Sequence, residues 1–152
     1  MTGGRIKRIA PYIDDDIFMV TYGDGLTDVD LPRLIDYHQS HKGIATVTAI
    51  QPKGRFGILN LNDSGMVEGF IEKPENGGSW INGGYMVMDR KIFDYISGDN
   101  TELERHVLIP LSANQELFAY KHHGFWHPMD TIWDKTNLEQ LYYSGKARWI
   151  RW

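Results

Sequence analysis

Asp24 is the residue of this chain that is best placed for chemistry. It lies between Gly23 and Gly25, directly after residues 18–22. That run of apolar, aromatic and β-branched residues predicts a strand that is buried on both faces. A carboxylate with no bulky neighbours, at the point where a buried strand reaches the surface, can hold a metal ion against a ligand. Asp-Gly is also the commonest dipeptide of tight turns, so a purely structural turn explains the same residues.

A second carboxylate, Asp130, closes a stretch that contains three histidines, His122, His123 and His127. Three histidines so close together are compatible with a transition-metal site. Their spacing matches no helical ligand pair, however, and the aromatic residues between them favour packing. Asp130 itself comes just before the expected start of a helix, so it is either an N-cap carboxylate or a metal ligand.

The beginning of the chain offers backbone donors. Thr2 is expected to cap a short helix over residues 5–9, and Gly3 and Gly4 leave backbone N–H groups uncovered at its start. Such an arrangement suits an anion or a nucleotide. An ordinary capped helix start also accounts for these residues, and the local sequence favours it.

Two further segments present polar groups at strand ends. Glu72 and Lys73 precede Pro74, which ends the ladder of an expected strand over residues 66–72. The alternative is a surface charge pair of little energetic consequence. Residues 80–88 predict another strand, and the two glycines near its start indicate a bulge or a close approach of the backbone to a ligand.

The elements that position these residues are predicted from periodicity and end signals. The expected helices carry clear caps: Asp30 begins one that contains Pro32 and ends at Gly43, and a last helix directs Leu138, Leu141 and Tyr142 inward. Pro110 should kink or split the helix that a capping box begins at Thr101. The expected strands cover residues 18–22, 44–50, 55–60, 66–72, 80–88 and 117–120, with a hairpin turn at residues 62–65.

Composition indicates one globular domain with a modest core. The chain has 152 residues, of which 41% are hydrophobic and 24% are charged. Its net charge of −4 opposes nucleic-acid binding, and the lack of cysteine excludes disulfides and thiolate zinc sites. No apolar run approaches the ~20 residues of a membrane span, and no signal-peptide core is present. We therefore expect a cytoplasmic protein that binds neither nucleic acid nor membrane.

Several motifs occur together in an order that resembles a known family. They are TGGR near the start and then TYGDG, RFG, FIEKP, WINGG and GFWHPMDT. The set resembles the sugar nucleotidyltransferases. GD and EKP are shared by many members, whereas TGGR, RFG, INGG and GFW-PMDT together are similar to the branch of glucose-1-phosphate cytidylyltransferases. The resemblance runs from Thr2 to the tryptophan-rich end of the chain.

The resemblance implies an α/β fold with a mainly parallel, Rossmann-like sheet flanked by helices. Residues 1–152 would form a single domain that matches only the C-terminal portion of the nucleotidyltransferase domain. Family members begin with a G-x-G-T-R loop and a following lysine that grip the triphosphate, and neither occurs in these 152 residues. The resemblance therefore implies that the N-terminal strands are lacking, and we expect little or no activity from the chain alone.

The resemblance also implies roles for individual residues. Asp24 and Asp130 would chelate Mg²⁺ between them, and Lys73 would act with them by binding the sugar phosphate. The reaction would convert CTP and glucose 1-phosphate into CDP-glucose and pyrophosphate. The remaining family positions would bind substrate: Glu72 the sugar hydroxyls, Gly57 and Asn82 the sugar pocket, and Thr2, Gly3, Gly4 and Arg5 the region near the nucleotide.

Two rival functions come from other classes. The chain could be a non-catalytic fragment that works by assembling with other chains. It could instead be a glycosyltransferase-like domain whose DxD motif is Asp28 and Asp30, although a helix cap also explains Asp30. We further expect a homo-oligomer, because the strand over residues 18–22 would lack family neighbours and the tail over residues 149–152 is aromatic.

Overall fold

A four-stranded sheet forms the centre of the computed structural model, which describes residues 1–52, 54, 57–72 and 79–150. Its strands are β1 (Ile17–Thr21), β3 (Ala45–Ile50), β6 (Ile81–Asp89) and β7 (Leu117–His122), in the spatial order β1-β6-β3-β7. Strands β1, β3 and β7 run in one direction, and β6 runs antiparallel between β1 and β3. The α/β fold is confirmed. The sheet is mixed, because β6 runs opposite to the other three strands.

Strand β1 forms an edge of this sheet among the described residues. The prediction that it is buried on both faces is wrong: its residues are half-buried or exposed, and Met19 is 39% exposed. An apolar run does not distinguish a central strand from an edge strand, because both need apolar side chains toward the core. Its exposed edge agrees with the expectation that this strand has few neighbours.

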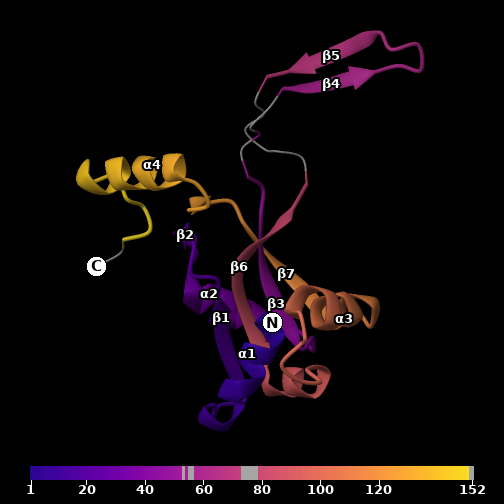
Figure 1. Ribbon diagram of the computed structural model, residues 1–152, viewed down its shortest axis with the longest axis vertical. Coiled ribbons are helices and arrows are strands. Elements are labelled where there is room, and N and C mark those ends of the chain that lie inside the picture. Colours follow the sequence, from indigo (N-terminus) through magenta and orange to yellow (C-terminus); the bar gives the residue numbers. More distant parts are fainter. Residues whose placement is uncertain (53, 55–56, 73–78, 151–152) are drawn as a thin grey trace.

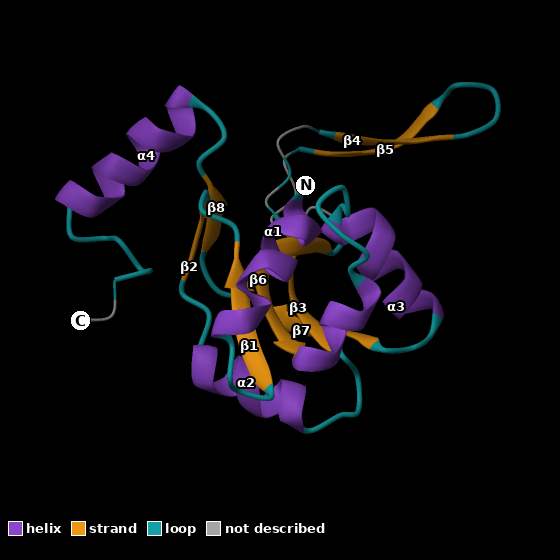
Figure 2. Ribbon diagram, turned by 60° about the horizontal axis from the view of Figure 1, so that its bottom comes forward, coloured by secondary structure: helices purple, strands orange, loops and turns teal. Residues whose placement is uncertain are grey.

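Helices cover both faces of the sheet (Figure 2). On one face, Met86 and Met88 of β6 and Ala45 of β3 pack into the main apolar cluster. On the opposite face, His38 of α2 (Leu31–Gln39) bonds to Thr46 of β3. The two faces alternate along each strand because successive side chains point to opposite sides.

The core lies between the first face and three helical segments. These are α1 (Thr2–Ile9) with the short η1 (Ala10–Tyr12), η2 (Arg90–Tyr95), and η3 (Glu104–Leu108), which continues into α3 (Ile109–Ala113). Burial of each large apolar side chain contributes about 1.5–3 kcal/mol. The fully buried members are Met86, Met88, Ile92, Leu103, Val107 and Leu111.

Pro110 lies within the helix that runs through η3 and α3. Proline lacks the N–H that would close a regular α-helical bond to the residue four positions earlier. The chain accommodates it with a π-helical segment, residues 104–108, directly before it. The helix that was expected to kink or split therefore continues past Pro110 by way of a wider π-helical segment. Short π-helical segments of this kind occur within α-helices.

A hairpin, a two-stranded ribbon and the last helix lie beyond the central sheet and the helices that cover it. A hairpin of β4 (Ile58–Leu61) and β5 (Val67–Ile71) stands apart from it, and a short ribbon pairs β2 (Gly25–Thr27) with β8 (Trp126–Pro128). Helix α4 (Ile132–Tyr143) extends from the end of the ribbon. Figure 1 shows the hairpin and α4 projecting from different sides of the sheet.

Most end signals are confirmed. Asp30 caps α2 by accepting from the Arg33 N–H at 3.1 Å, and Thr131 with Asp134 forms a complete capping box at α4. The β4–β5 hairpin and its turn at residues 62–65 form as expected, with Gly65 at φ +84°. Short-range caps and turns are predictable because they depend on neighbours in sequence.

Four local predictions are wrong. Met1, not Thr2, is the N-cap of α1, and helix α2 ends at Gln39 before Gly43 is reached. No side chain caps the start of η3, because the Glu104 carboxylate accepts from Tyr22 and Thr2 instead. Tyr142 is 56% exposed, since α4 presents most of its surface to solvent. In each case a tertiary contact, or its lack, overrides the local signal.

Candidate functional site

Asp24 and Asp130 lie at neighbouring strand ends. Asp24 occupies the turn that leads from β1 into β2, and Asp130 follows β8 just before the cap of α4. Gly25 pairs with Pro128 in the antiparallel ribbon, and the Met129 N–H donates to the Asp24 carbonyl at 2.7 Å. Both carboxylates are exposed. The tertiary structure thus brings together two acids that are far apart in sequence.

Gly23, directly before Asp24, leaves room for a ligand. A Cβ atom at Gly23 would have nothing within 4 Å, and Gly23 is exposed. No group of three or more histidine, cysteine, aspartate or glutamate residues within the described part of the chain could hold a metal ion. Two carboxylates fit Mg²⁺, which commonly takes one or two from the protein and completes its shell with water and substrate phosphates.

A cleft of about 1220 Å³ opens beside Asp130. The strand end of β3, the loop before β8, the start of α4 and Arg148 from the segment after α4 all line it. Among the described residues, two acids, three histidines and an arginine line it. They are Asp130, Asp134, His122, His123, His127 and Arg148.

Asp28 forms the buried anchor beneath this cleft. Its carboxylate accepts from the Phe125 N–H at 2.6 Å and lies 2.9 Å from His122 Nε2 and 2.7 Å from Arg148 Nη2. Gly124 has no side chain at the point where a Cβ would strike Asp28. These contacts hold the loop before β8 in place, which favours a structural role for Asp28.

No sequence pattern indicated the Asp28 network, because these partners lie in two segments that are distant from Asp28 along the chain, residues 122–125 and the segment with Arg148. The sequence Asp28-Val29-Asp30 is instead compatible with a DxD motif. In the structure, Asp28 is 8% exposed and Asp30 is engaged at the N-terminus of α2. The helix-cap interpretation of Asp30 is confirmed.

His127 and Asp134 form a second contact in the cleft wall. Asp134 is 1% exposed and accepts from both the N–H and the hydroxyl of Thr131. His127 Nε2 lies 3.2 Å from the Asp134 carboxylate, at an angle that makes no hydrogen bond. Nearby Trp133 contacts the His127 ring at 6.3 Å between centroids. The histidine is thus held between an acid and an aromatic ring, as packing predicts.

The INGG segment packs against the protein itself. Asn82 is exposed, and its side-chain oxygen accepts from the Gly84 N–H at 2.9 Å. Gly84 has φ +79°, and a Cβ there would lie 3.0 Å from the Tyr22 ring. A Cβ at Gly83 would lie 3.1 Å from Ile50. The two glycines therefore serve a close approach to β1 and β3, while Asn82 keeps its side chain at the surface.

Gly57 and Glu72 lie together at the base of the hairpin. A Cβ at Gly57 would be 3.0 Å from a Glu72 carboxylate oxygen and 2.8 Å from the Phe70 ring. Lys73, the other expected member of this group, lies outside the described residues. Figure 1 shows the β4–β5 hairpin standing apart from β2.

The residues at the start of the chain are used for packing. The Gly4 N–H donates to the Thr101 carbonyl at 3.2 Å, and side chains at Gly3 and Gly4 would collide with the backbone of Thr101 and Asp99. The Thr2 hydroxyl accepts from the Leu103 N–H at 3.0 Å. Arg5, in contrast, has an exposed side chain.

Tyr22 connects this region to Asp24. Its hydroxyl donates to the Glu104 carboxylate. Burial first, and then the hydrogen bond to Glu104 and the negative charges of Glu104 and Asp24, raise the pKa of Tyr22 well above its ordinary value of 10.0. The phenol is therefore a hydrogen-bond donor throughout the physiological pH range.

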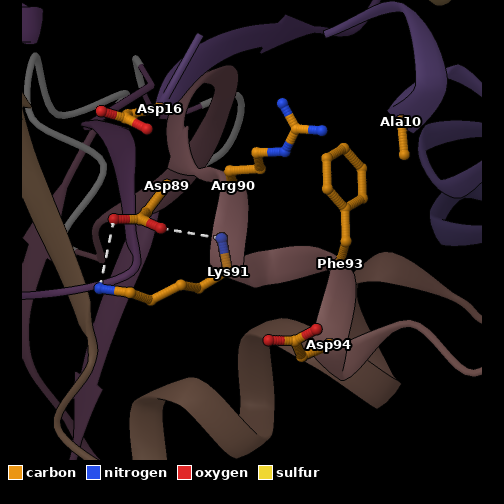
Figure 3. A pocket seen from close by; sticks show the side chains of 7 residues that line it. All are labelled: Ala10, Asp16, Asp89, Arg90, Lys91, Phe93 and Asp94. Carbon is orange, nitrogen blue, oxygen red and sulfur yellow. Dashed lines mark hydrogen bonds and ion pairs between the residues drawn. The ribbon is translucent and has the colours of Figure 1, made fainter. Parts of the chain in front are cut away.

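A second pocket of about 730 Å³ lies at the opposite end of the sheet, where β6 ends and β1 begins (Figure 3). Asp89 accepts from the Lys91 N–H at 2.8 Å and lies 3.8 Å from the Lys91 ammonium. The Arg90 side chain extends away from this pair in the figure and donates to the Ile13 carbonyl. Of the residues predicted to bind substrate, those that the structure describes do not line this pocket.

Comparison with curated proteins gives closely related sequences. The chain is 48% identical to glucose-1-phosphate cytidylyltransferase of Salmonella typhimurium and 40% identical to the probable enzyme of that name in Bacillus subtilis. Each alignment covers 100% of this chain and 59% of the relative. The chain thus spans about three fifths of the length of these relatives. No helix in the described residues is both long and apolar enough to cross a membrane.

Solved structures show the same fold at lower identity. HddC from Yersinia pseudotuberculosis superposes with a TM-score of 0.66 at 21% identity, over 93% of this chain and 62% of that protein. A putative glucose-1-phosphate thymidylyltransferase from Bacillus anthracis gives 0.65 at 20% identity, over 97% and 61%. The family model described as "Nucleotidyl transferase" matches residues 4–136. This chain therefore belongs to the nucleotidyl transferase family.

Proposed function

We propose that this chain contributes the metal-binding and sugar-binding part of a glucose-1-phosphate cytidylyltransferase. The observation that carries the proposal is the adjacency of Asp24 and Asp130 at the carboxyl end of β1 and beyond β8. Ligands of open α/β sheets bind at this end of the strands. The names of the relatives at 48% and 40% identity support cytidine as the base and glucose 1-phosphate as the sugar substrate.

In the proposed reaction, a phosphate oxygen of glucose 1-phosphate attacks the α-phosphorus of CTP. The bond from that phosphorus to the bridging oxygen breaks, and pyrophosphate leaves with the electron pair. Asp24 and Asp130 would hold Mg²⁺, which neutralises charge on the phosphate oxygens when bound. No protein nucleophile is required, so the chain's own task is to orient the two phosphates.

The remaining predicted residues have separate tasks in this proposal. Asn82 and Glu72 would bind sugar hydroxyls, and Lys73 would pair with the sugar phosphate. Arg5 keeps an exposed guanidinium for the nucleotide region, while Thr2, Gly3 and Gly4 support it by packing.

We expect little turnover from the chain alone. These 152 residues hold no G-x-G-T-R loop, and loss of one preorganised donor typically costs about 10²–10³ in rate. The assay is pyrophosphate release from CTP and glucose 1-phosphate with Mg²⁺, before and after addition of an N-terminal segment from a complete relative. We expect activity only after the addition.

Variants of the acid pair test the metal site in the same assay. Asp24→Asn and Asp130→Asn should each abolish the restored activity, whereas Asp63→Asn in the hairpin turn should leave it unchanged. Asp63 is an exposed acid with the same charge, far along the hairpin. Turnover that survives Asp24→Asn would refute the proposed metal site.

We also propose that the chain self-associates through the β4–β5 hairpin. Its large apolar side chains are 42–61% exposed, and a two-stranded sheet without a packed face is marginally stable in water. The same surface would serve the alternative function, a non-catalytic assembly module. The exposed residues are Ile58, Leu59, Leu61, Met66, Val67, Phe70 and Ile71.

A further inference from the structure

The β2–β8 ribbon is a separate sheet, so something must fix its position relative to the central sheet. Two side-chain hydrogen bonds reach across to do this. Trp126 on β8 donates its indole N–H to the Gly83 carbonyl on β6 at 2.8 Å. Tyr85 on β6 donates its hydroxyl to the Gly25 carbonyl on β2 at 2.7 Å. The ribbon and β6 thus each donate one side-chain hydrogen bond to a backbone carbonyl of the other.

Gly25 leaves space for the indole. A Cβ at this buried position would lie 3.6 Å from the indole nitrogen and 3.7 Å from the Gly83 carbonyl oxygen. A methyl group at Gly25 would make only ordinary van der Waals contact with these atoms, whereas a larger side chain would project toward the hydrogen bond between them. The small residue at this position therefore keeps the hydrogen bond from Trp126 to the central sheet unobstructed.

The hydrogen bond from Trp126 to Gly83 connects the segments that carry the proposed binding residues. Asp24 precedes Gly25 and Asp130 follows β8, so both acids are carried by the ribbon that Trp126 anchors. Asn82 precedes Gly83, whose carbonyl accepts the bond. Together with the Tyr85 hydrogen bond, this bond fixes where the ribbon that carries the two acids lies relative to the exposed amide of Asn82.

We propose that Trp126 is a positioning residue that couples binding of the divalent cation at Asp24 and Asp130 to binding of the sugar phosphate beside Asn82. The inference rests on the proposed function, because that function supplies both ligands. A sugar phosphate held by Asn82 places its phosphate oxygens toward the ribbon only while the ribbon keeps its place. Each ligand then strengthens binding of the other by the same factor, as linkage requires.

Trp126→Phe separates this role from simple packing. Phenylalanine keeps an aromatic ring but lacks the N–H, so the Gly83 carbonyl loses its side-chain donor. We expect each ligand alone to bind the variant within about threefold of the unmodified chain, since its own contacts remain. Only the mutual strengthening should disappear.

The test measures Mn²⁺ binding through the relaxation of water protons, with and without glucose 1-phosphate. In the unmodified chain, glucose 1-phosphate should tighten Mn²⁺ binding about tenfold, and in Trp126→Phe by less than about twofold. Tyr95→Phe is the matched control, because it also removes one tertiary hydrogen bond, from the Tyr95 hydroxyl to Glu116 at 2.6 Å, away from the cleft. It should keep the tenfold effect.

The outcomes distinguish this inference from the proposed function. If Asp24→Asn binds Mn²⁺ as well as the unmodified chain does, there is no metal site to position, and both proposals fail. If Asp24→Asn abolishes binding but Trp126→Phe keeps the full coupling, or the unmodified chain shows no coupling, only the role of Trp126 is refuted. Should Trp126→Phe fail to fold, Tyr85→Phe removes the second tie and must reduce the coupling for the inference to stand.

Discussion

Arg148 lies 2.7 Å from the carboxylate of Asp28, so the segment after α4 is bound to the loop that follows β2. The pair is unequal: the Asp28 side chain is 9% exposed, whereas that of Arg148 is 64% exposed. The Trp149 ring reinforces the contact by packing on Phe125 at 5.2 Å between centroids. The C-terminal segment thereby closes one side of the cleft.

Because Asp28 is buried and Arg148 is exposed, removal of each side chain should lower the free energy of unfolding by a different amount. Asp28→Ala should lower the free energy of unfolding by about 1–3 kcal/mol, because it leaves the Phe125 N–H without its acceptor. Arg148→Met should cost at most about 1 kcal/mol, because its charge is largely in water. Urea denaturation checks both, with Asp30→Ala at about 1 kcal/mol as a helix-cap reference. Equal losses for Asp28→Ala and Arg148→Met would contradict the buried anchor.

Gly4 provides a prediction about packing. Gly4→Ala should destabilise the chain by about 1–3 kcal/mol, although alanine favours helices, because the new methyl group meets the backbone of Asp99. Gly98→Ala is the control, since a Cβ there has nothing within 4 Å and should change stability by less than about 0.5 kcal/mol. Thermal or urea unfolding compares the two variants. A neutral Gly4→Ala would show that α1 packs less closely than described.

The pH dependence of stability follows from His38 and His41, which lie 2.9 and 2.8 Å from the Thr46 hydroxyl. Burial lowers the pKa of both, and the neighbouring His41 lowers that of His38 further. The unfolded chain therefore binds protons near the ordinary pKa of 6.5, before the folded chain does. Stability should be constant above that pH and fall as the pH drops below it.

His38→Gln should flatten this dependence, because the substituted side chain does not titrate. The measurement is the urea midpoint at about pH 7.5 and about pH 5.5 for the unmodified chain and the variant. His123→Gln is the control, since His123 is exposed and should leave the slope unchanged. A slope that is unaffected by His38→Gln would rule out this histidine as the source.

Sugar-phosphate binding can be tested without the nucleotide. The segments that carry Gly57, Glu72, Lys73 and Asn82 are all present in the chain, so glucose 1-phosphate should bind weakly. Calorimetry should show less heat for Lys73→Ala than for the unmodified chain, because a phosphate-binding ammonium is lost. Lys42→Ala, an exposed lysine elsewhere, should behave as the unmodified chain. Equal heats for all three would reject this site.

The hairpin predicts the assembly state. Phe70→Ser should shift the chain toward the monomer in sedimentation equilibrium, because it removes a ring that is 61% exposed from the centre of the apolar surface. Tyr12→Ser is the control, since Tyr12 is 84% exposed but lies on η1, away from the hairpin. A chain that is already monomeric at high concentration would disprove self-association.

The sequence by itself determined the features that depend on neighbours along the chain. The caps at Asp30 and Thr131, the turn before Gly65 and the family motifs could all be identified from short patterns. These signals are local because a cap or a turn satisfies its hydrogen bonds within a few residues. The α/β fold followed from the family resemblance that these motifs carry.

Only the tertiary structure decided which distant residues meet. It placed the antiparallel β6 between β1 and β3, paired Asp24 with the strand end that leads to Asp130, and set Asp28 beneath the cleft. Strand order and long-range contacts follow from how the apolar faces pack as a whole, and local pattern carries little information about that choice.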